Sequence, residues 1–338
     1  MRNVTTPTPL RWGILSTARI ARTRFIPGVR ASAEGTVAAV ASRDAGRART
    51  VAAELEIPRA HGSYEALLAD PGVDAVYIGL PNGLHPEWTV RAAAAGKHIL
   101  CEKPAARTRA DAARMAAAAR DAGVILMEAF MYRLHPQHAR VLELIQEGVI
   151  GEPVFVRATF CFAMARERRE ARDVRLQGEL QGGALMDVGC YAVNAARYVF
   201  GAEPLEVVAL ERRDRGNDVD TAFAGTLRFP GDRLAQIDGS FDASGTQRYE
   251  VAGAGGTILA ERAFLPGEGG GTLRINAGGR SRVEEIAGQD QYALEADHVA
   301  RSVRAGRLLP PAEDGVLQAA TMEALYESAA GGRAVVPG

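Results

Sequence analysis

The hydrophobic pattern of this chain changes character near residue 128. Between residues 10 and 127, short apolar runs alternate with segments in which apolar residues recur at helical spacing. This alternation is typical of β-α-β units, whose strands form a parallel sheet. It predicts strands at 10–15, 36–41, 75–80, 97–101 and 124–127, and helices at 19–28, 45–55, 63–69, 86–95 and 109–122. Residues 10–128 are therefore predicted to form an α/β domain.

Beyond that point the apolar runs are β-branched, alternate with polar residues and are separated by Gly, Pro and Asp turns, as in an antiparallel sheet. We predict strands at 154–162, 206–212, 222–229, 233–241, 248–252 and 257–260, and helices at 135–147, 184–200, 292–306 and 314–330. Residues 129–338 are thus predicted to be a second domain. The charged stretch 166–175 is predicted to be a mobile loop, and residues 1–9 a disordered lead-in rather than a signal peptide.

The composition narrows the range of partners. The 338 residues include 40 basic and 41 acidic side chains, which gives a formal net charge of −1, and 47% are hydrophobic. This balance argues against a nucleic-acid or membrane partner, and no apolar stretch is long enough to span a bilayer. Cys101, Cys161 and Cys190 follow no metal-ligand spacing. They predict reduced thiols in a cytoplasmic protein without a metal site.

One strand end carries the strongest candidate for chemistry. The predicted strand 97–101 is followed by Glu102, Lys103 and Pro104. In an open parallel sheet, ligands bind beyond the carboxyl ends of the strands, so we expect Lys103 to face a ligand. A lysine in that position can serve as an acid, a base or an electrostatic clamp. A surface lysine between a strand and a helix is the alternative.

The turn after the first strand is a degenerate form of a dinucleotide-binding turn. The G-x-G-x-x-G/A pattern permits a tight turn, close approach of the pyrophosphate and close helix packing. Here Ser16, Ala18 and Ala21 occupy the three glycine positions, and the helix that follows presents N–H groups to a phosphate. The expected cofactor contacts in this turn are Ser16, Thr17, Ala18, Arg19 and Ile20. A turn without a ligand is the alternative.

The end of the second strand indicates which dinucleotide binds. An NAD site usually has an acidic residue here, which holds the ribose 2′-hydroxyl. This chain instead has Ser42 followed by Arg43, and a hydroxyl beside a guanidinium suits a 2′-phosphate. We therefore predict NADP, with NAD less favoured. With a register one or two residues different, Asp44 could hold a ribose hydroxyl, and Arg43 could be an ordinary solvent-facing side chain.

Five motifs follow one another along the chain: residues 16–21, Ser42-Arg43, Pro81-Asn82-x-x-His85, Glu102-Lys103-Pro104, and Gly182-Gly183-Ala184-Leu185-Met186-Asp187-Val188-Gly189-Cys190-Tyr191. In this order they resemble the motifs of the Gfo/Idh/MocA oxidoreductases, the family of glucose-fructose oxidoreductase and inositol dehydrogenase. Within that family the chain is similar to the dimeric dihydrodiol dehydrogenases and the NADP-dependent D-xylose dehydrogenases. Over a shorter segment it is similar to the sugar 3-ketoreductases of deoxysugar biosynthesis.

The resemblance implies a Rossmann domain followed by an α/β domain with a large open, mostly antiparallel sheet, whose free face is usually buried in a homodimer or homotetramer. It implies hydride transfer between the nicotinamide of NADP and a hydroxyl or keto carbon of a sugar or related cyclic polyol. In the family, a cis peptide often precedes the proline of Glu-Lys-Pro. A nucleotide-deoxysugar 3-ketoreductase and a non-catalytic NADP-binding regulator are the alternatives.

The resemblance also assigns roles to residues. It maps the catalytic lysine onto Lys103, the carboxylate onto Asp187 and the proton-transfer residue onto Tyr191. Asp187 and Tyr191 are four residues apart, on one face of the predicted helix. Tyr191 could take the proton if Lys103 lowers its pKa, or Lys103 could be the base while Tyr191 orients the hydroxyl. Gly182 and Gly183 are expected to let the backbone approach a sugar closely.

Further residues are expected to line the cleft. Glu102 is expected to orient Lys103 or to contact the nicotinamide ribose. The other expected contacts near the cofactor are Pro81, Asn82 and His85, although His85 could equally be a helix-start residue. Arg133 and His135 are candidate substrate contacts. The loops of the second domain, including residues 160–176, are expected to reach the sugar hydroxyls.

Overall fold

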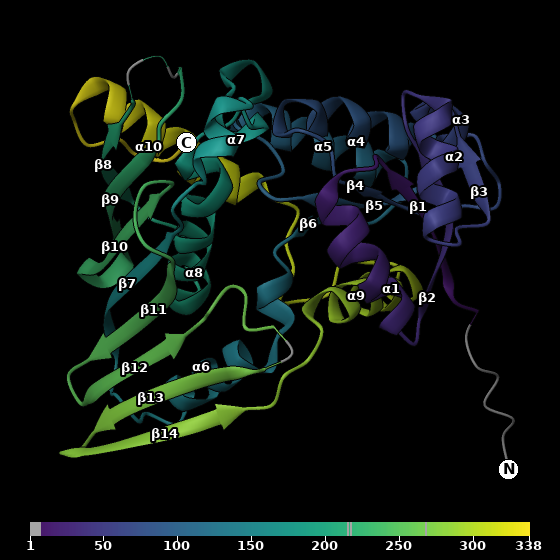
Figure 1. Ribbon diagram of the computed structural model, residues 1–338. Helices are drawn as coiled ribbons and strands as arrows, with labels where there is room; N and C mark the ends of the chain where they lie inside the picture. Colours follow the sequence, from purple (N-terminus) through teal and green to yellow (C-terminus); the bar gives the residue numbers. More distant parts are fainter. Residues whose placement is uncertain (1–7, 215, 217, 268) are drawn as a thin grey trace, which may run out of the picture.

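Two sheets organise the molecule in the computed structural model, which describes residues 8–338 except 215, 217 and 268 (Figure 1). The first sheet has the strand order β3-β2-β1-β4-β5-β6, and every pair is parallel. Its strands are β1 Leu10–Leu15, β2 Gly35–Ala41, β3 Arg59–His61, β4 Ala75–Ile78, β5 His98–Glu102 and β6 Leu126–Ala129. The strand order reverses between β1 and β4, which is where ligands bind in such sheets.

Helices cover both faces of this sheet: α1 Ile26–Ala31, α2 Ala45–Glu54, α3 Tyr64–Leu68, α4 His85–Ala94 and α5 Arg109–Asp121. Three of them begin at a residue whose side chain accepts a backbone N–H, namely Asp44 for α2, Ser63 for α3 and Thr108 for α5. The predicted Rossmann domain is confirmed. Its central strands are fully buried and therefore read as continuous apolar runs in the sequence.

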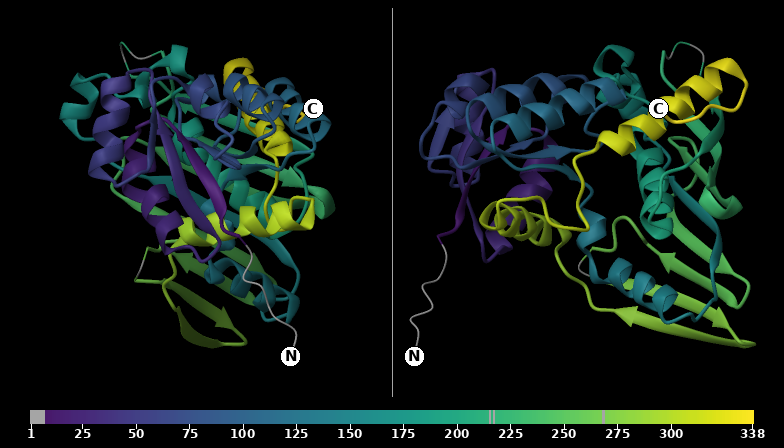
Figure 2. Two further views of the ribbon diagram at one scale, coloured as in Figure 1. Left: turned by 90° about the vertical axis from the view of Figure 1, so that its right-hand side faces the viewer. Right: turned by 180° about the vertical axis from the view of Figure 1, so that it is seen from behind.

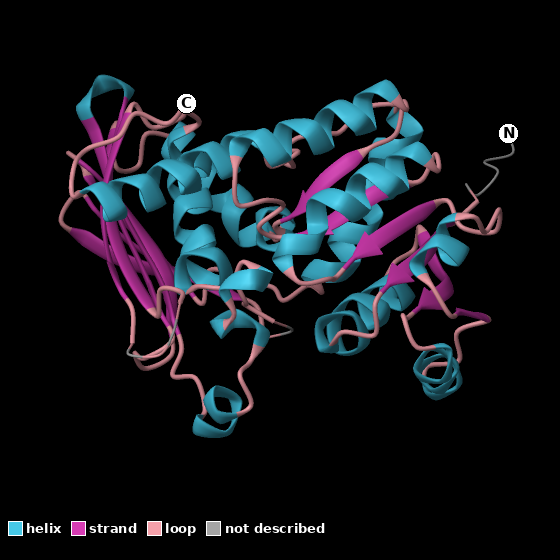
Figure 3. Ribbon diagram, turned by 90° about the horizontal axis from the view of Figure 1, so that it is seen from above, coloured by secondary structure: helices cyan, strands magenta, loops and turns pink. Residues whose placement is uncertain are grey.

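The second sheet has the strand order β14-β13-β12-β11-β7-β10-β9-β8 and is antiparallel except for the β7–β10 pair. Its strands are β7 Pro153–Cys161, β8 Glu206–Arg212, β9 Ala222–Phe229, β10 Arg233–Ser240, β11 Thr246–Gly253, β12 Gly256–Glu261, β13 Gly271–Ala277 and β14 Arg280–Ile286. The accompanying helices are α6 Pro136–Gln146, α7 Arg166–Glu170, α8 Cys190–Phe200, α9 Gln291–Ala305 and α10 Val316–Gly331. Helix α8 is almost entirely buried, because it lies between the large sheet and the first domain (Figure 1). Seen from above, helices fill the space between the strands of the two sheets (Figure 3).

Several elements differ from the sequence prediction. Strands β3, β13 and β14 were not predicted. β3 has three residues, and β14 is an edge strand whose residues are mostly charged or polar, so neither has a clear apolar signal. The stretch predicted as a loop at 166–175 contains the short helix α7. The predicted helix 19–28 continues to residue 31 and includes a π-helical turn, Ala21–Phe25.

Helix α9 returns to the first domain, although its residues fall within the predicted second domain (Figure 2). It packs against α1, and Ala296 and Val299 belong to the same buried cluster as Trp12 and Phe25. The two domains are therefore joined by the crossover after β6 and by the segments on both sides of α9.

The face of the large sheet that carries no helix is mixed in character (Figure 1). Cross-strand ion pairs lie on it, with 2.8 Å between Arg157 Nη1 and Glu250 Oε1 and 2.7 Å between Arg274 Nε and Glu261 Oε1. On the edge strand β8, the apolar side chain of Leu210 is 72% exposed. In the part of the chain that the structure describes, no helix is long and apolar enough to cross a membrane.

Candidate active site

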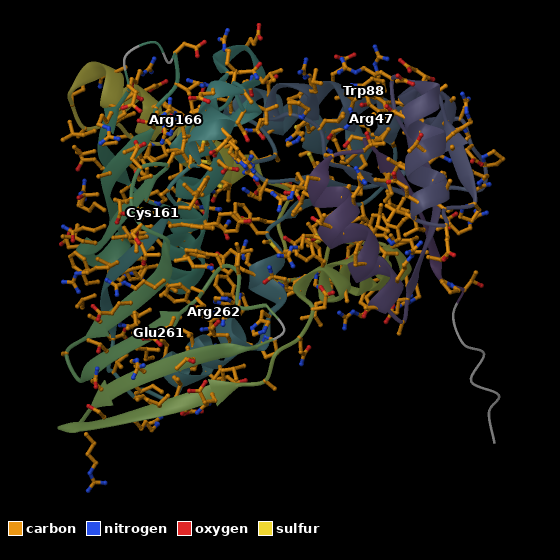
Figure 4. The ribbon with its side chains drawn as sticks, viewed as in Figure 1. Arg47, Trp88, Cys161, Arg166, Glu261 and Arg262 are labelled. Atoms are coloured by element: carbon orange, nitrogen blue, oxygen red, sulfur yellow. The ribbon has the colours of Figure 1, made fainter. Side chains whose placement is uncertain are left out.

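A cleft of about 930 Å³ lies between the two domains, beyond the carboxyl ends of the first sheet. The first domain contributes Ala18, Arg19, Ile20, Pro81, Asn82, Glu102 and Lys103 to its walls. The second domain contributes Met131, Phe160, Arg175, Asp187, Tyr191 and Arg262, and α9 contributes Tyr292. Arg262 directly follows β12, on the large sheet (Figure 4). Residues from both halves of the chain thus face one space.

The turn after β1 is closed by its own serine. Ser16 has a φ of 128°, a conformation that favours glycine. Its hydroxyl donates to the Gly79 carbonyl at 2.8 Å and accepts the Ala18 N–H at 3.1 Å. Ser16 and Thr17 are buried and do not line the cleft, so their contact with the cofactor stays a prediction. The cleft is lined instead by residues 18–20, where the helix begins and its N–H groups suit a pyrophosphate.

The end of β2 lies beside this turn, because Leu15 pairs with Ala41. Ser42 is buried, and its hydroxyl accepts the Asp44 N–H at 3.2 Å. The Asp44 carboxylate accepts the Arg47 N–H at 3.0 Å and caps α2, so it is already engaged. Arg43 is exposed, its guanidinium lies near the Tyr64 hydroxyl, and neither Ser42 nor Arg43 is among the residues that line the 930 Å³ cleft. This donor set fits the 2′-phosphate of NADP better than the 2′-hydroxyl of NAD.

Lys103 lies in the cleft between the two domains. Its side chain is 11% exposed, and its Nζ atom donates to the backbone carbonyl of Asp187 at 2.6 Å. The same atom lies 3.8 Å from Asp187 Oδ1 and 4.6 Å from the centre of the Tyr191 ring. The peptide bond between Lys103 and Pro104 is cis. The structure therefore brings the three predicted catalytic residues together.

The orientation of Tyr191 bears on which residue takes the proton. Lys103 faces the ring of Tyr191, while the hydroxyl points to Met131 Sδ at 3.6 Å. Tyr191 is 4% exposed, and burial raises its pKa well above the ordinary value. The ammonium is directed at the ring and not at the phenolic oxygen, so this arrangement provides no direct contact through which Lys103 would lower the pKa of Tyr191.

Asp187 has a second cationic partner that the sequence did not reveal. Arg175 Nε donates to Asp187 Oδ2 at 2.7 Å, and its Nη1 donates to Asp173 Oδ1 at 3.1 Å. Burial works against the charged form of Asp187, but Arg175 and Lys103 outweigh it and lower the pKa of the carboxyl group. The only sequence signal for Arg175 was its place in the 160–176 segment, which was expected to reach the sugar.

Gly182 and Gly183 lie close to other parts of the chain. A Cβ atom at Gly182 would lie 2.4 Å from the Arg175 carbonyl oxygen, and one at Gly183 would lie 2.2 Å from Asp220 Oδ1. The Asp220 carboxylate accepts the Leu185 N–H at 2.7 Å, at the start of the helix that carries Asp187. These glycines give space to the groups that hold this helix, and Gly182 also lines the cleft, so close approach of a sugar to its backbone stays a prediction.

Two predicted cleft residues near β4 and β5 are well placed. The carboxylate of Glu102 accepts the Tyr77 hydroxyl at 2.6 Å, and burial raises its pKa. Asn82 donates to the Gln181 carbonyl at 2.9 Å and so connects the domains. Pro81 also lines the cleft.

His85, Arg133 and His135 do not line the cleft, so their assignment as cofactor or substrate contacts is corrected. His85 is fully buried, and its two ring nitrogens lie 3.0 Å from the Pro104 carbonyl and 2.9 Å from the Leu80 carbonyl. The guanidinium of Arg133 pairs with Glu313, and His135 accepts the Gln137 N–H at the start of α6. All three side chains are polar groups used to hold the fold.

Comparison with known proteins agrees with this geometry. Residues 10–130 match the model of an oxidoreductase family with an NAD-binding Rossmann fold, and residues 138–259 match the GFO/IDH/MocA C-terminal domain. The chain belongs to the Gfo/Idh/MocA oxidoreductase family. Both the predicted resemblance and the predicted class of enzyme are thereby confirmed.

Three members of the family illustrate the similarity. The chain is 43% identical to D-xylose 1-dehydrogenase (NADP(+)) 2 of Haloferax volcanii, over 96% of this chain and 99% of that protein. The aldose-aldose oxidoreductase of Caulobacter crescentus, solved with glycerol, has a TM-score of 0.89 and 31% identity over 97% of this chain and 99% of its own. KijD10, a 3-ketoreductase from Actinomadura kijaniata solved with NADP and TDP-benzene, has a TM-score of 0.88 and 34% identity over 95% and 98%.

Proposed function

We propose that the protein is an NADP-dependent oxidoreductase that transfers a hydride between the nicotinamide and a hydroxyl or keto carbon of a sugar or related cyclic polyol. The observation that carries this proposal is the convergence of Lys103, Asp187 and Tyr191 in a cleft that also receives the helix start at residues 18–20. When bound, NADP supplies the hydride acceptor or donor.

The ends of β1 and β2 support binding of NADP. The N–H groups at residues 18–20 suit the pyrophosphate, and the exposed Arg43 suits the 2′-phosphate. The names of two related proteins, the D-xylose dehydrogenase and KijD10 in its complex, also specify NADP.

Lys103 and Tyr191 are the two residues that could receive the proton of the substrate hydroxyl. Oxidation of a CH–OH group removes a hydride from carbon and a proton from oxygen, and the protein must receive that proton. Lys103 and Tyr191 both line the cleft, but the Tyr191 hydroxyl is turned to Met131 Sδ, whereas Lys103 Nζ faces Asp187 and the Tyr191 ring. This arrangement supports Lys103 as the group that exchanges the proton and Tyr191 as a wall that orients the substrate.

The walls of the cleft suit a sugar. Asp187 and Arg175 offer an acceptor and donors for hydroxyl groups, while Phe160 and Met131 offer apolar surface to C–H groups. The names of related proteins include an aldose and a deoxysugar. A sugar or cyclic polyol combines both kinds of surface in one small molecule.

The chain has only two lysines, which provides a matched test. NADPH formation is measured with a panel of free sugars and polyols on the wild type, Lys103→Ala and Lys97→Met. Loss of Lys103 is expected to lower kcat by roughly 10²- to 10⁴-fold, as expected for a lost proton-transfer group. Lys97 donates to the Asp70 and Val73 carbonyls far from the cleft, so its variant is expected to lose stability but keep kcat. Full turnover by Lys103→Ala would contradict the assignment.

A nucleotide-sugar 3-ketoreductase is the second candidate, because KijD10 matches 95% of this chain. The reverse assay distinguishes the two: NADPH consumption with a dTDP-linked 3-keto sugar against the free-sugar panel. A wild type that binds NADPH and turns over neither class would favour the non-catalytic regulator.

We also propose that the protein is a cytoplasmic homodimer or homotetramer assembled through the large sheet. The three cysteines are free and buried, and one face of the sheet carries no helix (Figure 1). Light scattering on the purified protein measures its mass, and a monomer at working concentration would contradict the assembly.

A further inference from the structure

The Asp187 carboxylate lies between two cations that contact different oxygens. Arg175 Nε is 2.7 Å from Oδ2, whereas Lys103 Nζ is 3.8 Å from Oδ1. The short contact of Lys103, at 2.6 Å, is with the backbone carbonyl of Asp187 instead. The closer partner of the carboxylate is thus the guanidinium, not the ammonium.

Arg175 is fixed against the helix that carries Asp187. Its Nη1 donates to Asp173 Oδ1 at 3.1 Å, and its backbone carbonyl accepts the Gly183 N–H at 2.9 Å. Because Gly182 has no side chain, this carbonyl can approach where a Cβ atom would be only 2.4 Å away. The position of Arg175 is therefore set by the backbone as well as by its side chain, and Arg175 also lines the cleft.

We propose that Arg175 is a positioning residue that holds the Asp187 carboxylate away from Lys103 and so leaves the ammonium available to the substrate oxygen. This inference rests on the proposed function, in which Lys103 exchanges the proton. A planar guanidinium stays charged and binds a carboxylate with fixed geometry, whereas a flexible ammonium would close onto the same carboxylate if that partner were missing.

The ionisation of Asp187 gives a readout that a merely structural role would not move. Burial opposes its charge, and Arg175 together with Lys103 lowers its pKa below the ordinary value. Loss of the guanidinium removes the largest of the effects that lower this pKa and leaves Lys103 and Arg168 to oppose burial, so the pKa of Asp187 rises. Activity that needs the carboxylate ionised falls as pH decreases through this pKa. The acid limb of the pH–activity profile therefore lies at higher pH in a variant that lacks the Arg175 guanidinium.

The test compares Arg175→Met and Arg175→Gln with the wild type, on the sugar from the panel that is turned over fastest. We expect kcat to fall by roughly 10- to 100-fold through misplacement of Lys103 and Asp187, with the acid limb of the kcat profile at higher pH. NADPH binding, followed by fluorescence, should change much less than kcat. Arg175→Lys keeps the charge without the fork and should be intermediate.

The matched control is Arg166→Met, which removes an arginine from the same segment. Arg166 pairs with Glu170 on α7, and its side chain is 86% exposed (Figure 4). It is expected to leave both kcat and the pH profile unchanged.

The outcomes separate this inference from the proposed function. If Lys103→Ala is inactive while Arg175→Met and Arg175→Gln keep the wild-type kcat and acid limb, the inference is wrong and the proposed function stands. If Lys103→Ala is fully active, the catalytic assignment itself fails. If Arg175→Met does not fold, Arg175→Gln decides alone: an unchanged acid limb overturns the inference, and a limb at higher pH supports it.

Discussion

Lys103 and Asp187 are 84 residues apart in the chain, yet Lys103 Nζ donates to the Asp187 carbonyl at 2.6 Å. Lys103 follows the last residue of β5, and Asp187 lies in the π-helical turn Leu185–Gly189 that precedes α8. This hydrogen bond joins the dinucleotide-binding domain to the second domain at the cleft itself. The geometry of the site therefore depends on how the two domains pack.

Replacement of Tyr191 by Phe should lower kcat by less than replacement of Lys103 by Ala does. The hydroxyl contacts Met131 Sδ at 3.6 Å and is not paired with Lys103, so we expect kcat to fall by less than about 10²-fold. Steady-state kinetics on the same sugar measure it. Tyr132→Phe is the control, because that hydroxyl donates to Asn194 Oδ1. A loss as large as that of Lys103→Ala would instead identify Tyr191 as the base.

Replacement of Arg43 by Ala should discriminate between the two dinucleotides. A lost charge-assisted hydrogen bond to the 2′-phosphate costs about 1.5–3 kcal/mol, which is roughly 10- to 100-fold in affinity for NADP. NAD has no such phosphate and serves as the internal control. Titration calorimetry or fluorescence with each cofactor measures the effect, and equal weakening of both would exclude a phosphate contact by Arg43.

Glu128 should make stability depend on pH in the direction opposite to most carboxylates. Burial, followed by the Glu313 carboxylate, raises its pKa to about 8. Between about pH 4.3, the pKa of an unfolded glutamate, and about pH 8, the folded state keeps a proton on Glu128 that the unfolded state loses. The stability that this protonation contributes is therefore complete below that range and is lost as pH rises through it. Its full size is at most about 5 kcal/mol.

The Glu128→Gln variant tests this pH dependence. The glutamine carbonyl can still accept the Ala105 N–H, which Glu128 Oε1 accepts at 2.8 Å, but it cannot ionise. Urea unfolding at several pH values between 5 and 8 should show a decline for the wild type relative to the variant. Parallel curves would mean that Glu128 does not carry the effect.

His85→Leu should destabilise the first domain. The substitution leaves the Leu80 and Pro104 carbonyls without the ring that contacts both, and an unpaired buried acceptor costs about 1–3 kcal/mol. Urea unfolding measures the loss. His98 is less buried and accepts a single hydrogen bond, from the Ile125 N–H, so His98→Leu should lower the free energy of unfolding by less. An unchanged free energy of unfolding for His85→Leu would show that the two contacts contribute nothing.

The site was predicted well where one strand end carries the chemistry and poorly where partners come from elsewhere. Lys103 directly follows β5 and Asn82 comes four residues after the end of β4, and both strands read as apolar runs, so their place at the edge of the sheet could be derived. His85 stands in the same motif as Asn82, but it is turned inward by α4 and meets two carbonyls. No pattern in the sequence distinguishes these two orientations.

The sequence by itself determined the alternation of strands and helices, the small residues of the first turn and the Ser42-Arg43 pair, because each depends on neighbours close in the chain. Tertiary structure alone decided that Arg175 pairs with Asp187, that Tyr191 presents its ring to Lys103, and that α9 returns to the first domain. These contacts depend on the angle and distance between elements far apart in the chain. Such geometry is set by packing of the whole core rather than by local residue preferences.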